Sequence, residues 1–230
     1  MAPMTAKTNA SIVYFESEGR QNLHEVVRVI RRALRKRPEL RTLKMVIFTA
    51  EGQGPAIAYN MLREHRPKMI AVTFPLDFSV KLPDSEDRYF PRISEEVRRF
   101  FKVYEIDVIV PPDLPFDCIE GLDGHNQQVD LIKKTIAMFG SGFSLCIQAI
   151  LRACDVGALD EGELVIGMSG DIAGLFIASN TKHFLNKANG LQVVEILCKP
   201  RCLTISRRAP AQSNPISTAK ILEGEAPPSQ

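Results

Sequence analysis

Tryptophan is absent from this sequence of 230 residues, and cysteine is scarce, with five residues. An odd number of cysteines, most of them within apolar stretches, is typical of reduced thiols rather than of a disulfide framework. Cys198 and Cys202 form a single C-x3-C pair downstream of His183. Because no second close pair completes a zinc ligand set, we expect no metal site, and we interpret the cysteines as strand and core residues.

Long apolar runs are also lacking. No run reaches the roughly 18 residues of a membrane span, and the segment Met1–Ala10 has no apolar signal-peptide region. We therefore expect no membrane partner and a cytoplasmic location.

A large excess of charge of one sign is absent as well, since the formal net charge is +2. Basic residues gather between Arg20 and Lys44, a pattern that can indicate a nucleic-acid surface. However, no aromatic residues alternate with these charges, and apolar residues recur among them at helical spacing. These apolar residues are Leu23, Val27, Ile30 and Leu34. The segment predicts a helix with one buried and one solvated face, and no nucleic-acid partner.

Hydrophobic residues make up 45% of the chain, which is enough for a substantial core. After residue 206 the composition shifts to proline, serine, alanine and isolated charges. We predict that residues 1–10 are disordered, that residues 11–206 form one domain, and that residues 207–230 form a flexible tail.

The most informative segment is 45–73, MVIFTAEGQGPAIAYNMLREHRPKMIAVT. The apolar run Met45–Phe48 predicts a strand, Gly52 and Gly54 permit positive φ in a turn, and Pro55 suits the first position of a helix. A second apolar strand follows. The loop of this βαβ unit therefore leads into a helix N-terminus, where backbone N–H groups favour a phosphoryl group. A Gly-x-Gly pair also occurs where a turn needs glycine only for packing.

Other apolar patterns along the chain alternate between strand and helix periodicity, which indicates a parallel sheet. We expect strands at Ser11–Phe15, Ile70–Thr73, Ile106–Val110, Glu163–Met168 and Leu191–Cys198, with amphipathic helices between them. The nearly all-apolar run Leu145–Ala153 predicts a buried helix.

Three further stretches resemble those of a known family: IVYFESEGRQN at 12–22, MFGSGFSLCIQAILRACDVGAL at 138–159 and VEILCKPR at 194–201. Segment 45–73 resembles the C-terminal α/β domain of pyruvate kinase, and with these three stretches the chain more closely resembles the stand-alone proteins of the pyruvate kinase α/β-domain-like superfamily. The resemblance implies a single three-layer α/β/α domain with a mostly parallel mixed sheet. It also implies no pyruvate kinase activity, because that chemistry belongs to a separate barrel domain.

Two long connections, 74–91 and 111–126, are rich in proline and aspartate, and each follows an apolar strand. Together with loop 49–54, they should project from the carboxyl edge of the sheet, where open α/β sheets bind ligands. We therefore expect a cleft at this edge. The alternative is that these loops only cover the sheet ends or mediate a dimer.

Candidate site residues follow from these loops and from the resemblance. Arg20 could pair with a phosphate or lie on the surface, and Asn22 is expected to cap the following helix. His183 matches a histidine of the relatives. The full set of expected cofactor-binding residues is Arg20, Thr49, Gly52, Gly54, Thr73, Gly167, Ser169, Gly170, Asp171 and His183.

The chain departs from its relatives at several glycine-rich positions. Their Gly-Gly-x-x-x-Gly-Ala-Asp-Thr-Ala run corresponds to VIGMSGDIAGLF at 165–176, where Ser169 and Asp171 could replace the Asp-Thr pair. Their Gly-Asp-Thr-Ala corresponds to Gly52-Gln-Gly-Pro, and their Gly-His-Gly to Gly140-Ser-Gly. These changes indicate altered specificity or weakened binding.

The sequence thus predicts a homo-oligomeric protein that binds a phosphorylated small molecule or nucleotide at the carboxyl edge. Flavin mononucleotide (FMN) is the most specific ligand that the resemblance suggests, with its ring among Phe74, Phe78 and Phe116. The alternatives are a non-catalytic oligomeric scaffold and, third, a flavin-dependent enzyme whose chemistry the cofactor would supply.

No catalytic residue is assigned. Asp117, Cys118, Asp123 and His125 lie close together in the sequence, but a Cys/His site is assembled in space, so sequence proximity alone does not indicate one.

Overall fold

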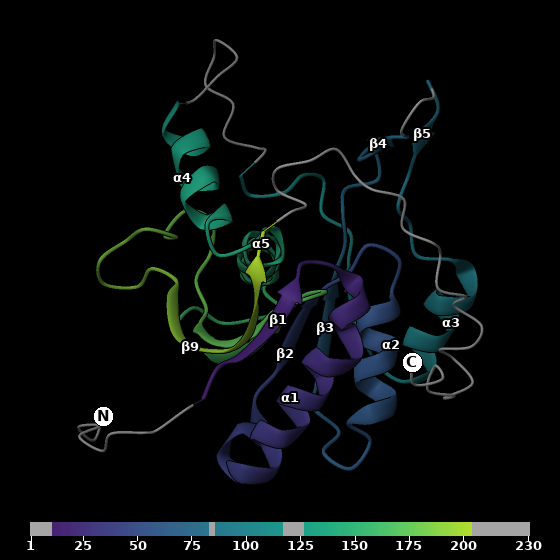
Figure 1. Ribbon diagram of the computed structural model, residues 1–230, viewed down its shortest axis with the longest axis vertical. Helices are drawn as coiled ribbons and strands as arrows, with labels where there is room; N and C mark the ends of the chain where they lie inside the picture. Colours follow the sequence, from purple (N-terminus) through teal and green to yellow (C-terminus); the bar gives the residue numbers. More distant parts are fainter. Residues whose placement is uncertain (1–10, 83–85, 117–126, 204–230) are drawn as a thin grey trace.

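The computed structural model describes residues 11–82, 86–116 and 127–203. In this part of the chain, seven strands form a sheet in the order β1-β9-β8-β7-β2-β3-β6 (Figure 1). All neighbouring pairs are parallel except the two that β8 makes. The predicted α/β class with a mostly parallel sheet is confirmed. The predicted disordered start, flexible tail and last three residues of the domain lie outside the described residues.

The strands of the large sheet are β1 (Val13–Ser17), β2 (Met45–Phe48), β3 (Met69–Val72), β6 (Asp107–Ile109), β7 (Leu164–Met168), β8 (Ala173–Ile177) and β9 (Gln192–Cys202). A separate two-stranded antiparallel pair, β4 (Val80–Lys81) and β5 (Arg88–Tyr89), lies in the connection after β3. That pair was not expected from the sequence.

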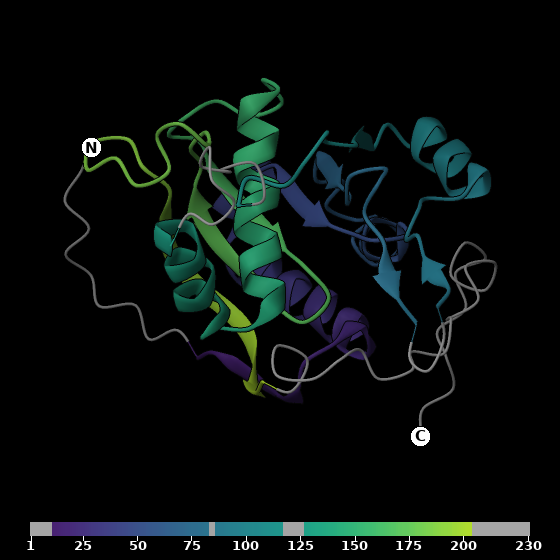
Figure 2. The same cartoon turned by 90° about the horizontal axis from the view of Figure 1, so that it is seen from above.

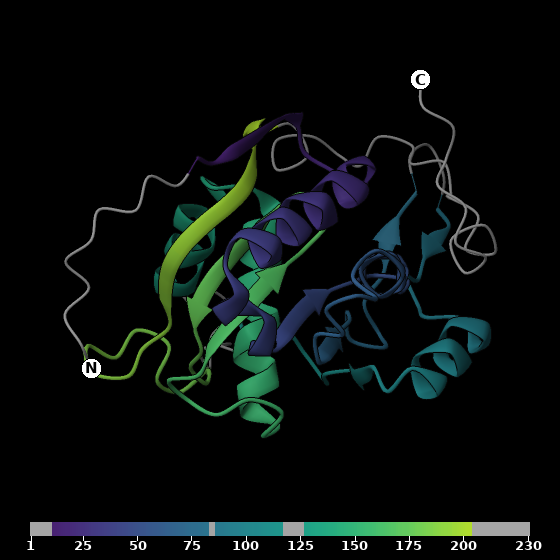
Figure 3. The same cartoon turned by 90° about the horizontal axis from the view of Figure 1, so that it is seen from below.

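Helices cover both faces of the sheet (Figures 2 and 3). They are α1 (Leu23–Lys36), α2 (Gln53–Met61), α3 (Glu95–Val103), α4 (Gln127–Ala137) and α5 (Ser141–Asp155), with short 3-10 turns η1 (Arg20–Asn22) and η2 (Pro38–Thr42). Helices α1, α2 and α3 contribute to one apolar core, and α4 and α5 to the other. The layers are therefore α/β/α.

Strand β2 shows why two cores form. Successive side chains of a strand point to opposite faces, so Met45 and Ile47 pack with α1 and α2, whereas Val46 and Phe48 pack with α5. All four residues are buried. This double burial explains why the strand is a continuous apolar run rather than an alternating one.

Strand β8 was missed in the sequence, where only two late strands were expected. Met168 and Ala173 pair across a tight turn in which the Ser169 amide donates to the Ile172 carbonyl at 3.0 Å. The two turn residues, Gly170 and Asp171, are a recognised hairpin signal. The resemblance assigns these residues to a glycine-rich run of the relatives, and for this reason no strand was expected after them.

Two local predictions at helix starts were wrong. The Asn22 side chain makes no capping bond to α1; its amide instead donates to the carbonyls of Ser17 and Gly19, at 2.8 and 3.1 Å. Asn22 belongs to η1, which leads directly into α1, so it does not act as an N-cap. Its side chain instead stabilises the loop before η1. Pro55 is the third residue of α2 rather than its first, since the helix already begins at Gln53.

Within the described ranges, no single helix is both long and apolar enough to cross a membrane. The segments Leu131–Ala137 and Ser141–Asp155 pass a test of length and composition together, but they are bent by 120° relative to each other.

Candidate functional site

A cavity of about 190 Å³ opens at the carboxyl edge of the sheet. It lies between the ends of β2 and β7, where Thr49 and Ser169 line it. After β2 the chain continues outward to β3 and β6, and it later returns to place β7 on the other side of β2. The cavity therefore occupies a topological switch point, the usual ligand position in an open α/β sheet.

Six of the ten expected site residues line this cavity: Arg20, Thr49, Gly54, Ser169, Gly170 and Asp171. They come from three separate loops, after β1, β2 and β7. The structure thus brings together residues that are up to about 150 positions apart in the sequence, and the N-termini of α2 and α5 meet at the same cavity.

The N-terminus of α5 is already occupied by carboxylates of the protein. Glu18 Oε1 accepts hydrogen bonds from the Ser141 amide at 2.9 Å and from the Ser141 hydroxyl at 3.2 Å. Asp171 Oδ2 accepts from the Gly19 amide at 2.8 Å. Glu18 and Asp171 are both 3% exposed. Because negative charge stabilises a helix N-terminus, these two groups already take the position that a phosphate would occupy.

Gly142 allows the carboxylate of Asp171 to approach α5. A Cβ atom at position 142 would lie 2.1 Å from Asp171 Oδ1 and 2.5 Å from Ser169 Oγ. Neither group can move freely, because both are buried. Gly142 and Glu18 were not among the site residues expected from the sequence, where Gly142 appeared only as part of a changed glycine motif.

Burial raises the pKa of the Asp171 carboxyl group above its ordinary value. The Gly19 amide opposes this shift, because it bonds to the ionised form, whereas the negative charge of Glu18 adds to the increase in pKa. The buried carboxyl group is therefore a hydrogen-bonding group that takes up a proton more readily than an ordinary aspartate.

The N-terminus of α2 has a different arrangement. Its N-cap, Gly52, has φ +95°, a left-handed conformation that favours glycine, and its amide donates to Thr49 Oγ1 at 2.9 Å. The next two residues, Gln53 and Gly54, line the cavity. No acidic residue lies in the first turn of this helix.

Arg20 and Glu51 lie beside the N-terminus of α2. Arg20 Nη1 is 3.3 Å from Glu51 Oε2, and Gln53 Nε2 donates to the same oxygen at 2.7 Å. The side chains of Arg20 and Glu51 are 29% and 21% exposed. Among the described residues that line the cavity, Arg20 is the only arginine, and an incoming anion would compete with the Glu51 carboxylate for its guanidinium group.

Four expected residues do not line the cavity. Gly52 faces α3, since a Cβ there would lie 2.5 Å from Val97 Cγ1. Gly167 is inside the sheet, where a Cβ would meet Cys146 and Phe176 at 2.7 Å. The buried Thr73 donates its hydroxyl to the neighbouring Phe74 carbonyl at 2.9 Å.

His183 is the fourth, and it lies at the opposite edge of the sheet. Its Nδ1 is 3.0 Å from Glu161 Oε2, in the loop that precedes β7. The reason is the direction of β8: because this strand runs antiparallel to its neighbours, the loop that follows it leaves from their amino edge. The prediction placed His183 by family position alone and did not include this reversal.

The aromatic residues expected to hold a flavin ring contact other rings. Phe74 stacks on Phe78 with ring centroids 3.9 Å apart and an angle of 5°. Phe116 is 3% exposed and packs against Phe184 at 5.4 Å. No open slot separates Phe74 from Phe78, so the residues present do not fit a flavin ring between them.

Cysteine and metal chemistry receive no support from the described residues, which contain no group of three or more potential metal ligands. Four described cysteines are free thiols, and burial raises the pKa of Cys198 to about 12 and that of Cys146 further. High pKa values make these thiols poor nucleophiles. The cluster of acidic, cysteine and histidine residues at 117–125 lies outside the described residues.

No known protein-family model matches the sequence.

Proposed function

We propose that the chain binds a phosphorylated small molecule in the carboxyl-edge cavity, as a stand-alone pyruvate kinase C-terminal-like domain without pyruvate kinase activity. The observation that carries this proposal is the N-terminus of α2, which opens into the cavity beside Arg20. A helix N-terminus and an arginine together provide both backbone N–H groups and a bidentate partner for a phosphate.

The α2 and α5 ends of the cavity would bind different parts of the ligand, the phosphate and a hydroxyl group respectively. The phosphate would lie at Gln53 and Gly54, because the corresponding position on α5 is occupied by Glu18 and Asp171. Asp171 would instead bond to a ligand hydroxyl group. Its carboxyl group would accept a hydrogen bond from the hydroxyl when ionised and could donate one to it when protonated. A sugar phosphate carries both kinds of group.

The volume of about 190 Å³ supports a small ligand. Sites for drug-sized molecules usually measure about 300–1,000 Å³, so the cavity favours a molecule the size of a sugar phosphate over FMN. If FMN were the ligand, its phosphate would lie at the same helix N-terminus and its ring outside the cavity. A visible spectrum of the purified protein with a band near ~450 nm would identify a bound flavin, whose own chemistry would then be available.

Calorimetric titration with inorganic phosphate, ribose 5-phosphate and fructose 1,6-bisphosphate tests the proposal. We expect at least one sugar phosphate to bind more tightly than inorganic phosphate, and Arg20→Gln to weaken it about tenfold, as expected for loss of a charge-assisted pair. Arg98→Gln is the matched control, because Arg98 is an exposed arginine outside the cavity. Absence of binding by all three ligands, or equal affinity in the Arg20 and Arg98 variants, would contradict the proposal.

A second candidate function, an oligomeric scaffold, has its own support in β9. The register pairs Val13 of β1 with Cys198 of β9, so residues 192–197 extend beyond β1. Among the described strands, this part of β9 has a neighbour only on the β8 side, and Val193 and Val194 are 43% and 48% exposed. An apolar edge strand is a template for pairing with a second chain.

Light scattering after size-exclusion chromatography tests this scaffold. Edge pairing predicts a dimer that Val194→Lys converts to a monomer, whereas Lys182→Ala, at an exposed position outside the strand, leaves it unchanged. A monomer in the unmodified protein would contradict the scaffold function.

A further inference from the structure

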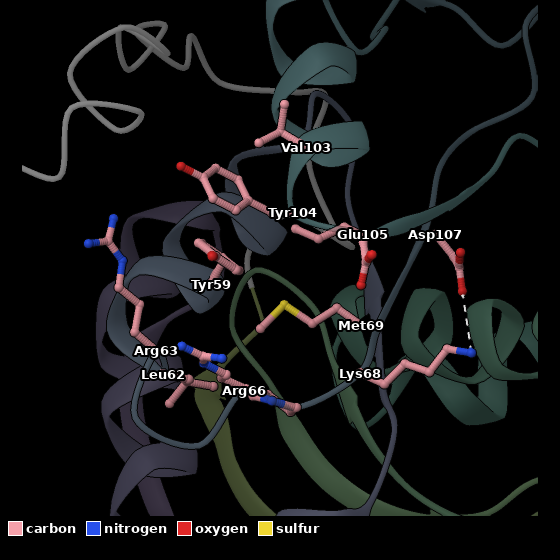
Figure 4. A pocket seen from close by; sticks show the side chains of 12 residues that line it. Tyr59, Leu62, Arg63, Arg66, Lys68, Met69, Val103, Tyr104, Glu105 and Asp107 are labelled. Atoms are coloured by element: carbon pink, nitrogen blue, oxygen red, sulfur yellow. Dashed lines mark ion pairs between the residues drawn. The ribbon is translucent and has the colours of Figure 1, made fainter.

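A second and wider cavity lies at the other edge of the sheet. This groove has a volume of about 780 Å³, within the range of small-molecule sites. Its walls are the C-terminal ends of α2 and α3 and the residues that lead into β3 and β6 (Figure 4). It shares no residue with the carboxyl-edge cavity.

Backbone conformation distinguishes this groove from the rest of the molecule. Arg66 has φ +44° and Glu105 has φ +53°, and they are the only non-glycine residues with positive φ among those described. Both line the groove, one on each wall. Glycine is the usual residue at such a position after a helix. The chain therefore has long charged side chains at two positions where the backbone conformation favours glycine.

The wall formed by the α2–β3 connection is cationic. Arg63, Arg66 and Lys68 line it; in Figure 4 the Arg63 and Lys68 side chains extend in opposite directions, Lys68 towards Asp107, with Arg66 between them. Arg63 donates to Asn60 at 2.8 Å, and Lys68 is 3.9 Å from Asp107. Arg66 is exposed and has no ion-pair partner in the described part of the chain. This guanidinium group is therefore available to an anion.

The upper end of the groove is aromatic. Tyr104 packs against Tyr59 with ring centroids 4.3 Å apart, and both rings contact Phe100. These contacts fix the orientation of Tyr104, which nevertheless remains 39% exposed. A fixed, partly exposed ring is a suitable surface for stacking of a planar group.

The opposite wall carries the carboxylates of Glu105 and Asp107. Such groups accept hydrogen bonds from hydroxyl or amino groups. The groove therefore combines three kinds of contact within one cavity: cations, an aromatic face and carboxylate acceptors.

We propose that this groove binds a nucleotide. The phosphates would pair with Arg66, supported by Arg63 and Lys68; the base would stack on Tyr104; and the ribose hydroxyls would donate to Glu105 or Asp107. A simple sugar phosphate has no planar group for Tyr104, and an aliphatic acid has no donors for the carboxylates. This site does not depend on the function proposed for the carboxyl-edge cavity.

Calorimetric titration of the full chain with ADP, GDP, CDP and UDP tests the proposal. We expect at least one to bind with a Kd below about 1 mM, and Tyr104→Ala to weaken it about fivefold or more, as stacking losses do. Arg20→Gln should leave this affinity unchanged, because Arg20 lines only the other cavity. If none of the four binds, or if binding depends on Arg20 and not on Tyr104, the proposal is overturned.

Arg66→Gly separates a binding role from a structural one. Glycine relieves the positive φ, so we expect Tm to rise by about 2–4 °C, while nucleotide affinity falls about tenfold or more. If Arg66 served only to compensate the carbonyl groups at the end of α2, its replacement by glycine would lower Tm and leave nucleotide affinity unchanged. That second outcome, or unchanged affinity with a raised Tm, would overturn the assignment of Arg66.

Discussion

The two edges of the sheet differ in how their polar groups are satisfied. At the carboxyl edge, helix N-termini meet, and the buried carboxylates of Glu18 and Asp171 accept hydrogen bonds from backbone amides in a cavity of about 190 Å³. At the amino edge, helix C-termini meet, and the groove of about 780 Å³ is open and holds the exposed Arg66. The carboxyl edge is thus a packed polar network, and the amino edge is an accessible surface.

This difference shows that the position of a cavity in the fold does not by itself determine which ligand it can take. Parallel topology places helix N-termini at the carboxyl edge, but one of them, that of α5, is occupied internally by Glu18 and Asp171. The anion-binding capacity of this edge is therefore reduced, whereas at the amino edge any anion binding depends on side chains such as Arg66 rather than on helix ends. Four substitutions would test or refine this contrast.

Gly142→Ala should have the largest effect. The new Cβ would lie 2.1 Å from Asp171 Oδ1, so we expect the free energy of unfolding to fall by about 3 kcal/mol, measured by urea denaturation. Gly170→Ala is the matched control in the same cavity, because its nearest contact would be an ordinary 3.4 Å to the Arg20 Cα. Equal stabilities of the two variants would show that the carboxylate network is not tightly packed.

Glu51→Gln should increase anion binding at the carboxyl edge. The substitution removes the negative charge that lies 3.3 Å from Arg20 and competes with an anion for its guanidinium group, and we expect phosphate affinity to rise about fivefold. Titration with inorganic phosphate measures the change, with Glu39→Gln as the control at an exposed position. A lower affinity in the Glu51 variant would mean that this carboxylate orients Arg20 for binding rather than competing with the ligand.

Asp171→Asn tests the buried carboxyl group through the pH dependence of stability. Because the pKa of Asp171 is raised in the folded protein, its contribution to stability is greatest below the ordinary aspartate pKa and is lost as the pH rises through the higher folded value. The asparagine variant should therefore gain stability relative to the unmodified protein as the pH rises from about 4. Urea unfolding at a series of pH values measures this difference, and a constant difference would contradict the raised pKa.

Glu64→Gln should have the smallest effect and the opposite pH dependence. Arg31 and Arg35 lower the pKa of Glu64 to about 2, so the contribution of its ion pairs is present above the ordinary pKa near 4.5 and is lost as the pH falls towards 2. The stability difference between this variant and the unmodified protein should disappear at low pH. A stability difference that stays constant as the pH falls to about 2 would contradict the lowered pKa of Glu64.

Much of the fold was predictable because the pattern of apolar residues and the position of turns depend on residues close together in the sequence. The runs Met45–Phe48 and Leu145–Ala153 correctly predicted a buried strand and a buried helix. Strand β8 was missed although its hairpin signal, Gly170-Asp171, was present. This strand also brings His183 to the amino edge, because the direction of one strand decides from which edge the next loop leaves.

The candidate sites were less predictable, since they depend on contacts between distant segments. Two Gly-x-Gly patterns, at Gly52 and Gly140, each precede a helix and look equivalent in the sequence. The first turn of α2, after Gly52, carries no acidic residue; at α5, after Gly140, Glu18 bonds to Ser141 across 123 positions of the chain. No local pattern contains this information.

Local sequence patterns were enough to indicate the strand–helix alternation around β1, β2, β3, β6 and β7, the apolar character of the central strands and the loops after β1, β2 and β7 that line the cavity, because periodicity and turn chemistry act over a few residues. The tertiary structure decided which polar groups are already paired. It placed Asp171 against the Gly19 amide and positioned Arg66 opposite Glu105. Pairing of this kind depends on distances between segments far apart in the chain, and it determines which helix ends and charges are available to a ligand.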